Sequence, residues 1–221
     1  MKKLSTKLLV FLFASLTLSS CMKSGNNDDY LRQIEEEKQR IDLLMRTEKP
    51  IIESYVMKNL PTAEVDTVNF PLQQLGIKIQ RGIWYQVIAP ATDNSYEYKL
   101  TNNGYNVQVK PPIVKLKYTV KMLDGTVILQ DKEGSTYDFS SNNNAFVTYA
   151  VTAAFYPYTL KLNGESFTIF GLTKDGLKKG SKFRIVTPSL WAYGNRAVTI
   201  DSKSVPANTP LDYEFEVLNI E

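Results

Sequence analysis

The sequence predicts an α+β protein in which an antiparallel sheet wraps around one short helix and a longer helix precedes the sheet. Three observations predict this fold class. Apolar residues recur at helical spacing between residues 30 and 59, short β-rich runs follow residue 82, and one two-turn helical pattern lies among those runs. No internal repeat is visible in the 221 residues, so we expect one sheet domain with an N-terminal helical segment.

Composition excludes several classes of function. The chain carries 26 Lys and Arg against 23 Asp and Glu, and three of the lysines lie in the first 20 residues, which contain no acid. The remaining chain is neutral, so we expect no binding to nucleic acid, which requires a basic face. The sequence has no histidine and one cysteine, which excludes His-based triads, His-ligated metal sites and an intrachain disulfide. We expect no metal and no other cofactor.

Residues 1–20 have the pattern of a signal peptide, because a basic start leads into an apolar run that is short for a bilayer span. The segment from Leu18 to Cys21 resembles the lipobox of bacterial lipoproteins, which implies cleavage before Cys21 and its acylation, for instance with palmitate. Residues 21–29 are a polar tether. Their acidic end is similar to the surface-export tag of some Bacteroidetes lipoproteins, although a solvated linker explains it equally well. We expect a lipid-anchored envelope protein of the outer membrane, with the periplasmic or surface side left open.

Residues 30–81 are predicted to be a helical N-terminal segment and a linker. The helix covers residues 30–59, with a stripe of apolar residues on one side and with Pro50 as a break or kink. The stripe either docks on the chain's own domain or pairs with a second copy in a homodimer. Residues 60–81 are expected to be a mixed connection.

Residues 82–221 are the predicted sheet domain. Asp124-Gly125 is a strong hairpin signal between two β-rich runs, and Asn163-Gly164 marks a loop. The one helix of this domain is expected over Leu172–Lys179, with Gly180 as its C-terminal cap. Strands are expected at residues 83–88, 114–120, 182–186 and 211–218.

The order of these segments resembles the FKBP-type peptidyl-prolyl cis-trans isomerases of the macrophage-infectivity-potentiator kind. The stretch most similar to that family runs from Lys178 to Gly194 and has the family's spacing from the helix-ending glycine to Ala192-Tyr193-Gly194. The likeness covers residues 82–221. It implies an FKBP-like fold and activity on the X–Pro bonds of exported polypeptides.

The resemblance also implies a pocket lined by hydrophobic side chains. Tyr193 matches the tyrosine whose hydroxyl bonds the substrate carbonyl, and Tyr118 matches the tyrosine of the central strand, so these two are the expected catalytic residues. Further positions match the pocket wall, its floor and the backbone NH that binds substrate. These expected substrate-binding residues are Ile128, Tyr137 or Phe139, Ile169, Phe170 or Leu172, Val205 and Tyr213.

The sequence departs from the family pattern in three places. Ile128-Leu129 stand where the family has an aromatic residue and an aspartate; Asp131 is a candidate replacement or a solvated turn residue. The tryptophan of the pocket floor is replaced by Phe170 or Leu172. Additional residues lie between positions 140 and 165, where the pocket rim should be.

These observations predict a membrane-anchored peptidyl-prolyl isomerase that assists protein folding. Rotation about an X–Pro bond needs no nucleophile, because a dry hydrophobic cleft that fits the twisted, less polar amide lowers the barrier. One alternative is a catalytically weak or inactive FKBP-like module that binds peptides or proteins. Another is a structural lipoprotein that dimerises through residues 30–59, with the sheet domain as a spacer. The missing carboxylate at Ile128-Leu129 is the feature that divides the isomerase from the binding module.

Overall fold

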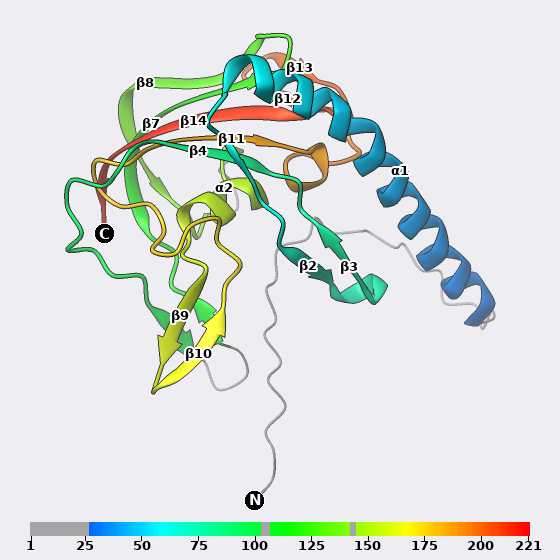
Figure 1. The fold of residues 1–221 in the computed structure, drawn as a ribbon, viewed down its shortest axis with the longest axis horizontal. Helices are drawn as coiled ribbons and strands as arrows, with labels where there is room; N and C mark the ends of the chain where they lie inside the picture. The colour runs from blue at the N-terminus through cyan, green and yellow to red at the C-terminus, as the bar shows by residue number, and fades with distance from the viewer. Residues whose placement is uncertain (1–26, 103–106, 142–144) are drawn as a thin grey trace, which may run out of the picture.

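The computed structural model describes residues 27–102, 107–141 and 145–221 (Figure 1). Its main layer is a six-stranded antiparallel sheet in the order β1-β4-β11-β14-β7-β8. Helix α1 (Asn27–Asn59) lies over one face of this sheet and the short helix α2 (Tyr149–Phe155) lies against the other (Figure 1). The predicted α+β architecture is confirmed. The strands are β1 (Glu64–Val65), β4 (Trp84–Ala89), β7 (Ile113–Met122), β8 (Val127–Asp138), β11 (Lys182–Thr187) and β14 (Leu211–Ile220).

Four two-stranded ribbons and two 3-10 turns complete the elements of the described residues. Asn163 and Gly164 join two ribbon strands and both have positive φ values, of 52° and 84°, which a tight hairpin turn requires. The ribbons are β2 (Asn69–Leu72) with β3 (Ile77–Gln80), β5 (Leu100–Asn102) with β6 (Val107–Val109), β9 (Thr159–Leu162) with β10 (Glu165–Thr168), and β12 (Val198–Ile200) with β13 (Lys203–Val205). The 3-10 turns are η1 (Gln73–Leu75) and η2 (Ser189–Trp191).

The central strands form where the sequence predicts them, and their side chains alternate between the two faces of the sheet. On β7 the buried residues follow a period of two. The opposite face carries polar pairs, such as the 3.3 Å ion pair between Lys182 of β11 and Glu216 of β14, and also the apolar Val186, which α1 covers. The apolar face meets α2 and forms the main core. Its buried strand residues include Leu116, Tyr118, Val120, Phe183, Ile185, Tyr213 and Phe215.

The short helix lies in a different segment from the predicted one. Residues 172–179 form a loop, and the helix is α2, within the stretch interpreted as additional residues. Gly176 explains the error, because its φ of 72° is not helical and a Cβ there would lie 2.5 Å from the Phe155 carbonyl oxygen. By contrast, α2 follows Thr148 and contains three alanines, the residue with the highest helix propensity.

Pro50 was expected to break or kink the helix, and the structure excludes the break, since α1 is continuous through this residue. It also begins at Asn27, inside the segment expected to be a tether. Its C-terminal half packs Ile52, Val56 and Leu60 against Val186 of the sheet. Burying each of these side chains contributes about 1.5–3 kcal/mol, and together they exceed the roughly 3 kcal/mol cost of an internal proline. Among the described residues, no helix is both long enough and apolar enough to cross a bilayer.

The segment between α1 and β4 contributes to the sheet and to the core. β1 adds a strand next to β4, and Phe70 belongs to the main core cluster. Arg81 is fully buried, with its Nε 2.5 Å from an Asp66 carboxylate oxygen. Its Nη1 donates hydrogen bonds to the Tyr149 hydroxyl at 3.1 Å and to the Phe170 carbonyl. One arginine therefore joins the N-terminal segment to the start of α2 and to the segment after β10.

A second buried charge connects α1 to the turn η2. Glu48 is 3% exposed and accepts hydrogen bonds from the Ser189 backbone NH, at 2.8 Å, and from the Ser189 hydroxyl. Burial raises the pKa of Glu48 above its ordinary value, although the two hydrogen bonds from Ser189 act in the opposite direction. Because η2 leads directly into Tyr193, this contact ties the long helix to one of the predicted site residues.

Replacing Arg81 by methionine should lower the free energy of unfolding by about 3–5 kcal/mol, because the carboxylate of Asp66 would remain buried without its partner. Denaturant unfolding monitored by circular dichroism measures this loss. The control is Arg46→Met, which removes an exposed ion pair with Asp42 and should cost less than about 1 kcal/mol. Equal losses in the two variants would contradict a structural role for the buried pair.

Replacing Glu48 by glutamine should favour the folded state increasingly as the pH rises. The pKa of Glu48 in the folded state lies above 4.5. The parent protein therefore has its full stability from this group below about pH 4.5, where Glu48 is protonated in both states, and loses it as the pH rises through the folded-state pKa. Glutamine stays neutral and does not lose this stability. Urea unfolding of both proteins from roughly pH 4 to pH 8 measures the difference. Glu36→Gln, which removes an exposed carboxylate from the same helix, reports the effect of charge alone. If the free energy of unfolding of Glu48→Gln relative to the parent protein stays constant or falls with rising pH, the raised pKa of Glu48 would be contradicted.

Candidate functional site

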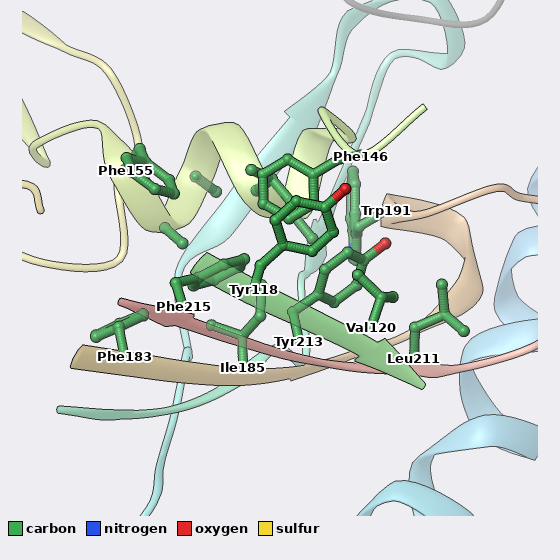
Figure 2. Close-up of a cluster of buried hydrophobic side chains, with 14 of the residues drawn as sticks. Tyr118, Val120, Phe146, Phe155, Phe183, Ile185, Trp191, Leu211, Tyr213 and Phe215 are labelled. Carbon is green, nitrogen blue, oxygen red and sulfur yellow. The ribbon is translucent and has the colours of Figure 1, made fainter. Parts of the chain in front are cut away.

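Tyr118, Tyr213 and Phe146 lie together between the apolar face of the sheet and α2 (Figure 2), and Tyr137 joins them in a cluster of four aromatic rings. Tyr118 of β7, Tyr137 of β8 and Tyr213 of β14 come from neighbouring strands or their ends, and Phe146 comes from the segment just before α2. The Tyr118 and Tyr137 ring centroids are 5.4 Å apart. Phe146 lies 5.9 Å from Tyr137 and 6.4 Å from Tyr213. Three of the tyrosines predicted for a pocket wall therefore gather around one phenylalanine that was not predicted.

Phe146 fills the place where the sequence predicts an open hydrophobic hollow. Its ring stacks on Tyr118 with centroids 4.1 Å apart and planes inclined by 27°, and its edge meets Phe215 at 5.6 Å. Figure 2 shows Phe146 directly over the Tyr118 ring. Phe146 is 1% exposed and Tyr213 is fully buried. At this separation nothing fits between the two rings, so the hollow is closed by the chain's own residue.

Tyr193 follows η2 and reaches the edge of the same cluster. Its hydroxyl donates a 3.0 Å hydrogen bond to the carbonyl of Ala145, the residue before Phe146. The preceding turn is held by Trp191, which is fully buried and whose indole NH donates to the Arg81 carbonyl at 2.8 Å. The two buried charges described above thus support the turn that presents Tyr193.

The tyrosine hydroxyls of the cluster are neutral donors at physiological pH. Burial is the main cause that raises the pKa of Tyr118, Tyr137, Tyr193 and Tyr213 above the ordinary value. The charge of Asp131 adds to this effect at Tyr137, and the neighbouring Tyr118 adds to it at Tyr193. Proton transfer by these groups would need far more basic conditions, so they act as fixed hydrogen-bond donors.

Asp131 lies beside the cluster, opposite Tyr118 in the β7–β8 register. Its carboxylate accepts hydrogen bonds from the Tyr137 hydroxyl at 2.7 Å and from the backbone NH groups of Gly134 and Ser135 at 2.7 and 2.8 Å. Burial opposes ionisation, but these hydrogen bonds together lower the pKa of Asp131 well below its ordinary value. The carboxylate orients Tyr137 and fixes the irregular turn in β8, while Ile128 and Leu129 are buried in the core.

The residues predicted for the pocket floor lie apart from the cluster. Phe170 packs on Phe70 at 5.2 Å and on Tyr158 at 6.3 Å, with a left-handed φ of 64°. The Ile169 NH, expected to bind substrate, donates to the Tyr158 carbonyl at 2.8 Å. Leu172 bonds through its NH to Ala153 of α2. This placement follows from the position of the helix, because α2 precedes these residues instead of beginning at them.

Two further predicted residues have roles in packing. Phe139 meets Phe155 of α2 with ring centroids 4.8 Å apart, so Tyr137 and not Phe139 contacts the Tyr118 cluster. Val205 is buried in β13. Cys21, the predicted lipidation site, lies outside the described residues. Two surface hollows lie away from the cluster and are lined by Tyr96, Glu97, Lys99, Lys110, Pro111 and Glu221, and by Ile51, Ser54, Tyr55, Lys58, Asn59, Lys121, Leu123, Asp124 and Gly125.

Sequence reasoning missed Phe146 and α2, although a signal for both was present. Between Phe146 and Phe155, the buried residues Ala150, Val151, Ala154 and Phe155 recur at helical spacing behind Thr148. Thr at the position before a helix is a common N-terminal cap residue. A helix assigned here would have placed Phe146 next to the cluster.

Similar folds occur in solved structures of peptidyl-prolyl isomerases and FKBP proteins. A peptidyl-prolyl cis-trans isomerase from Pseudomonas syringae pv. tomato has a TM-score of 0.46 and 18% identity, covering 81% of this chain and 95% of its own. FkpA from Escherichia coli has a TM-score of 0.45 and 14% identity, covering 90% and 74%. AtFKBP13 has a TM-score of 0.41 and 16% identity, covering 63% and 94%. No protein-family model matches this sequence, and no curated protein matches it.

Proposed function

We propose that the chain is a folding factor of the peptidyl-prolyl cis-trans isomerase type, which acts on X–Pro bonds of exported polypeptides. The observation that carries the proposal is the hydrogen bond from the Tyr193 hydroxyl to the backbone carbonyl of Ala145. This bond lies at the edge of a buried aromatic cluster that contains Tyr118 and Tyr213. This cluster combines an apolar surface for a ring with one neutral donor for the adjacent carbonyl. Both are what a twisted prolyl amide requires.

The chemistry follows from the electronic structure of the amide. The planar X–Pro bond is stabilised by resonance, and its rotation has a barrier of roughly 18–20 kcal/mol. A site that removes water from the planar amide and fits the twisted one lowers this barrier without any proton transfer. Tyrosines whose pKa values are raised by burial are suited to this task, because they stay protonated and donate throughout the physiological range.

A peptide-binding module without fast turnover is the second candidate, and the position of Phe146 favours it. A prolyl ring can reach Tyr118 only when the Phe146 ring is elsewhere, since the two rings are stacked at 4.1 Å. In addition, no carboxylate occupies position 128 or 129, and Asp131 bonds Tyr137 and backbone NH groups. Peptide binding without acceleration of exchange is the expected property of this second candidate.

Replacing Tyr193 by phenylalanine should lower kcat/KM for an Ala-Pro peptide about tenfold, which corresponds to one hydrogen bond made in the transition state. Cis–trans exchange measured by NMR reports the rate. The matched control is Tyr96→Phe, a tyrosine that packs against Tyr98 outside the cluster, and its rate should equal that of the parent protein.

We expect the rate of cis–trans exchange to be constant between about pH 6 and pH 9, because the tyrosine pKa values are raised and that of Asp131 is lowered. If exchange is no faster than in buffer, the isomerase function is excluded and the peptide-binding module is the function that the prediction favours.

The proposal includes a lipid anchor on Cys21 that holds the domain at the cell envelope, in the outer membrane. The lipobox-like segment from Leu18 to Cys21 supports it. Cys21→Ser should move the protein from the membrane fraction to the soluble fraction, because two acyl chains are enough for stable anchoring. Fractionation and the mass of the mature N-terminal peptide measure this. Ser24→Ala, a change in the tether, is the control. A Cys21→Ser protein that stays with the membrane would contradict the anchor.

The proposal leaves a place for a second copy of the chain along residues 30–59. The N-terminal part of α1 extends beyond the edge of the sheet (Figure 1), and Tyr30 and Leu31 are more than half exposed there. Ile41 and Leu44, by contrast, are buried on the chain's own domain. A homodimer contact through this helix would therefore use its first turns, and the docked part would remain within one chain.

A further inference from the structure

We infer that Ala145-Phe146 is an internal occupant of the peptide site, bound through the contacts that an incoming X–Pro or X–Phe segment would use. This inference rests on the proposed function for the identity of the site, and it names the class of peptide that the site accepts. The recognised unit is a backbone carbonyl followed by a flat apolar ring. In the structure, the carbonyl belongs to Ala145 and the ring to Phe146.

The contacts of this dipeptide are those of a bound peptide ligand. The Ala145 carbonyl accepts its hydrogen bond from a side chain, Tyr193, that is 48 residues away in the sequence. The Phe146 ring stacks on Tyr118 and meets the edge of Phe215. None of these contacts depends on the dipeptide being part of the same chain. A separate segment with a carbonyl before a ring can replace each of them, and a prolyl ring is smaller than the phenyl ring that it would displace.

The Phe146 ring and helix α2 are held by different side-chain contacts, although the Phe146 carbonyl accepts a 3.0 Å hydrogen bond from the NH of Thr148, the residue before α2. Ala145 is exposed and Val147 is half-buried, so Phe146 is the one fully buried side chain of residues 145–147. Helix α2 has its own anchors: the Tyr149 hydroxyl accepts a hydrogen bond from Arg81, and the Tyr149 ring packs 5.1 Å from Phe70 and 5.0 Å from Trp191. These anchors of α2 do not involve the Phe146 ring, so displacement of that ring would leave them intact.

An internal occupant reduces the apparent affinity for any external peptide, because a peptide binds only to the fraction of molecules in which the site is free. Removing the Phe146 ring should therefore increase affinity without adding any contact. It should also leave a cavity lined by aromatic rings, and apolar cavities of this kind bind small apolar groups.

The test is calorimetric titration of the Phe146→Ala variant with two acetylated, amidated peptides, Ala-Pro-Ala and Ala-Phe-Val-Thr. The second is the sequence of residues 145–148 supplied from outside. We expect both peptides to bind about tenfold or more tightly to Phe146→Ala than to the parent protein. The matched control is Phe155→Ala, which removes a fully buried ring that also packs on Phe215, at 5.6 Å, but belongs to α2. This control should show no gain.

The outcomes separate the inference from the proposed function. If Phe146→Ala binds the peptides more tightly but does not accelerate cis–trans exchange, the inference that Ala145-Phe146 occupies the site is supported and the proposed isomerase function is excluded. Equal affinities in Phe146→Ala and the parent protein, or equal gains in Phe146→Ala and Phe155→Ala, would overturn the internal occupant whether or not the protein catalyses exchange. If Phe146→Ala does not fold, Phe146→Leu takes its place, since it keeps most of the apolar volume and loses the ring stack; its gain over the parent must again exceed that of Phe155→Ala.

Discussion

The apolar face of the six-stranded sheet must be kept from water, and the rest of the structure depends on how the chain covers it. This face carries aromatic side chains from neighbouring strands, including Tyr118, Tyr213 and Phe215. Helix α2 has only seven residues and cannot cover so wide a surface. Phe146, which precedes the first turn of α2, shields a further part of the aromatic face from water, and it is therefore buried as deeply as the apolar residues of α2. The closed hollow is thus a consequence of a short helix on a large aromatic face.

The cover is held in position by the N-terminal segment. Arg81 contacts Asp66 directly after β1, Tyr149 at the start of α2 and the Phe170 carbonyl after the β9–β10 ribbon. A buried guanidinium is stable only with its partners in place, so these segments are positioned together. Glu48 acts in the same way between α1 and η2, the turn before Tyr193. Residues far from the cluster in sequence therefore determine the geometry of both sides of the candidate site.

The parts of the fold that depend on local patterns could be predicted from the sequence, and those that depend on distant contacts could not. Alternating apolar residues and the Asp124-Gly125 turn predict the β7–β8 hairpin, and the structure brings Tyr118, Tyr137 and Tyr213 together around one ring. Residues 172–179 resembled a helix because they contain lysines and end at a glycine, but Gly176 in their middle has a left-handed φ. Arg81 gave no local signal, since its partners are 15, 68 and 89 residues away. Helix α2 did have a local signal, in buried residues at helical spacing behind Thr148, but seven residues are fewer than the window in which periodicity is reliable.

Because Phe146 closes the hollow, the contacts that stabilise the folded chain are the same contacts that a peptide ligand would need. The buried ring of Phe146 contributes to folding through its contacts with Tyr118 and Phe215, and any ligand that takes its place must supply comparable contacts. A peptide with a ring after a carbonyl can do so, whereas a polar peptide cannot, so the occupant also acts as a filter on what binds. With the proposed internal occupant, selectivity at this site would come from competition with a segment of the same chain, and would need no charged group in the cluster. That agrees with a chain that has no histidine and whose cluster tyrosines are kept neutral by burial.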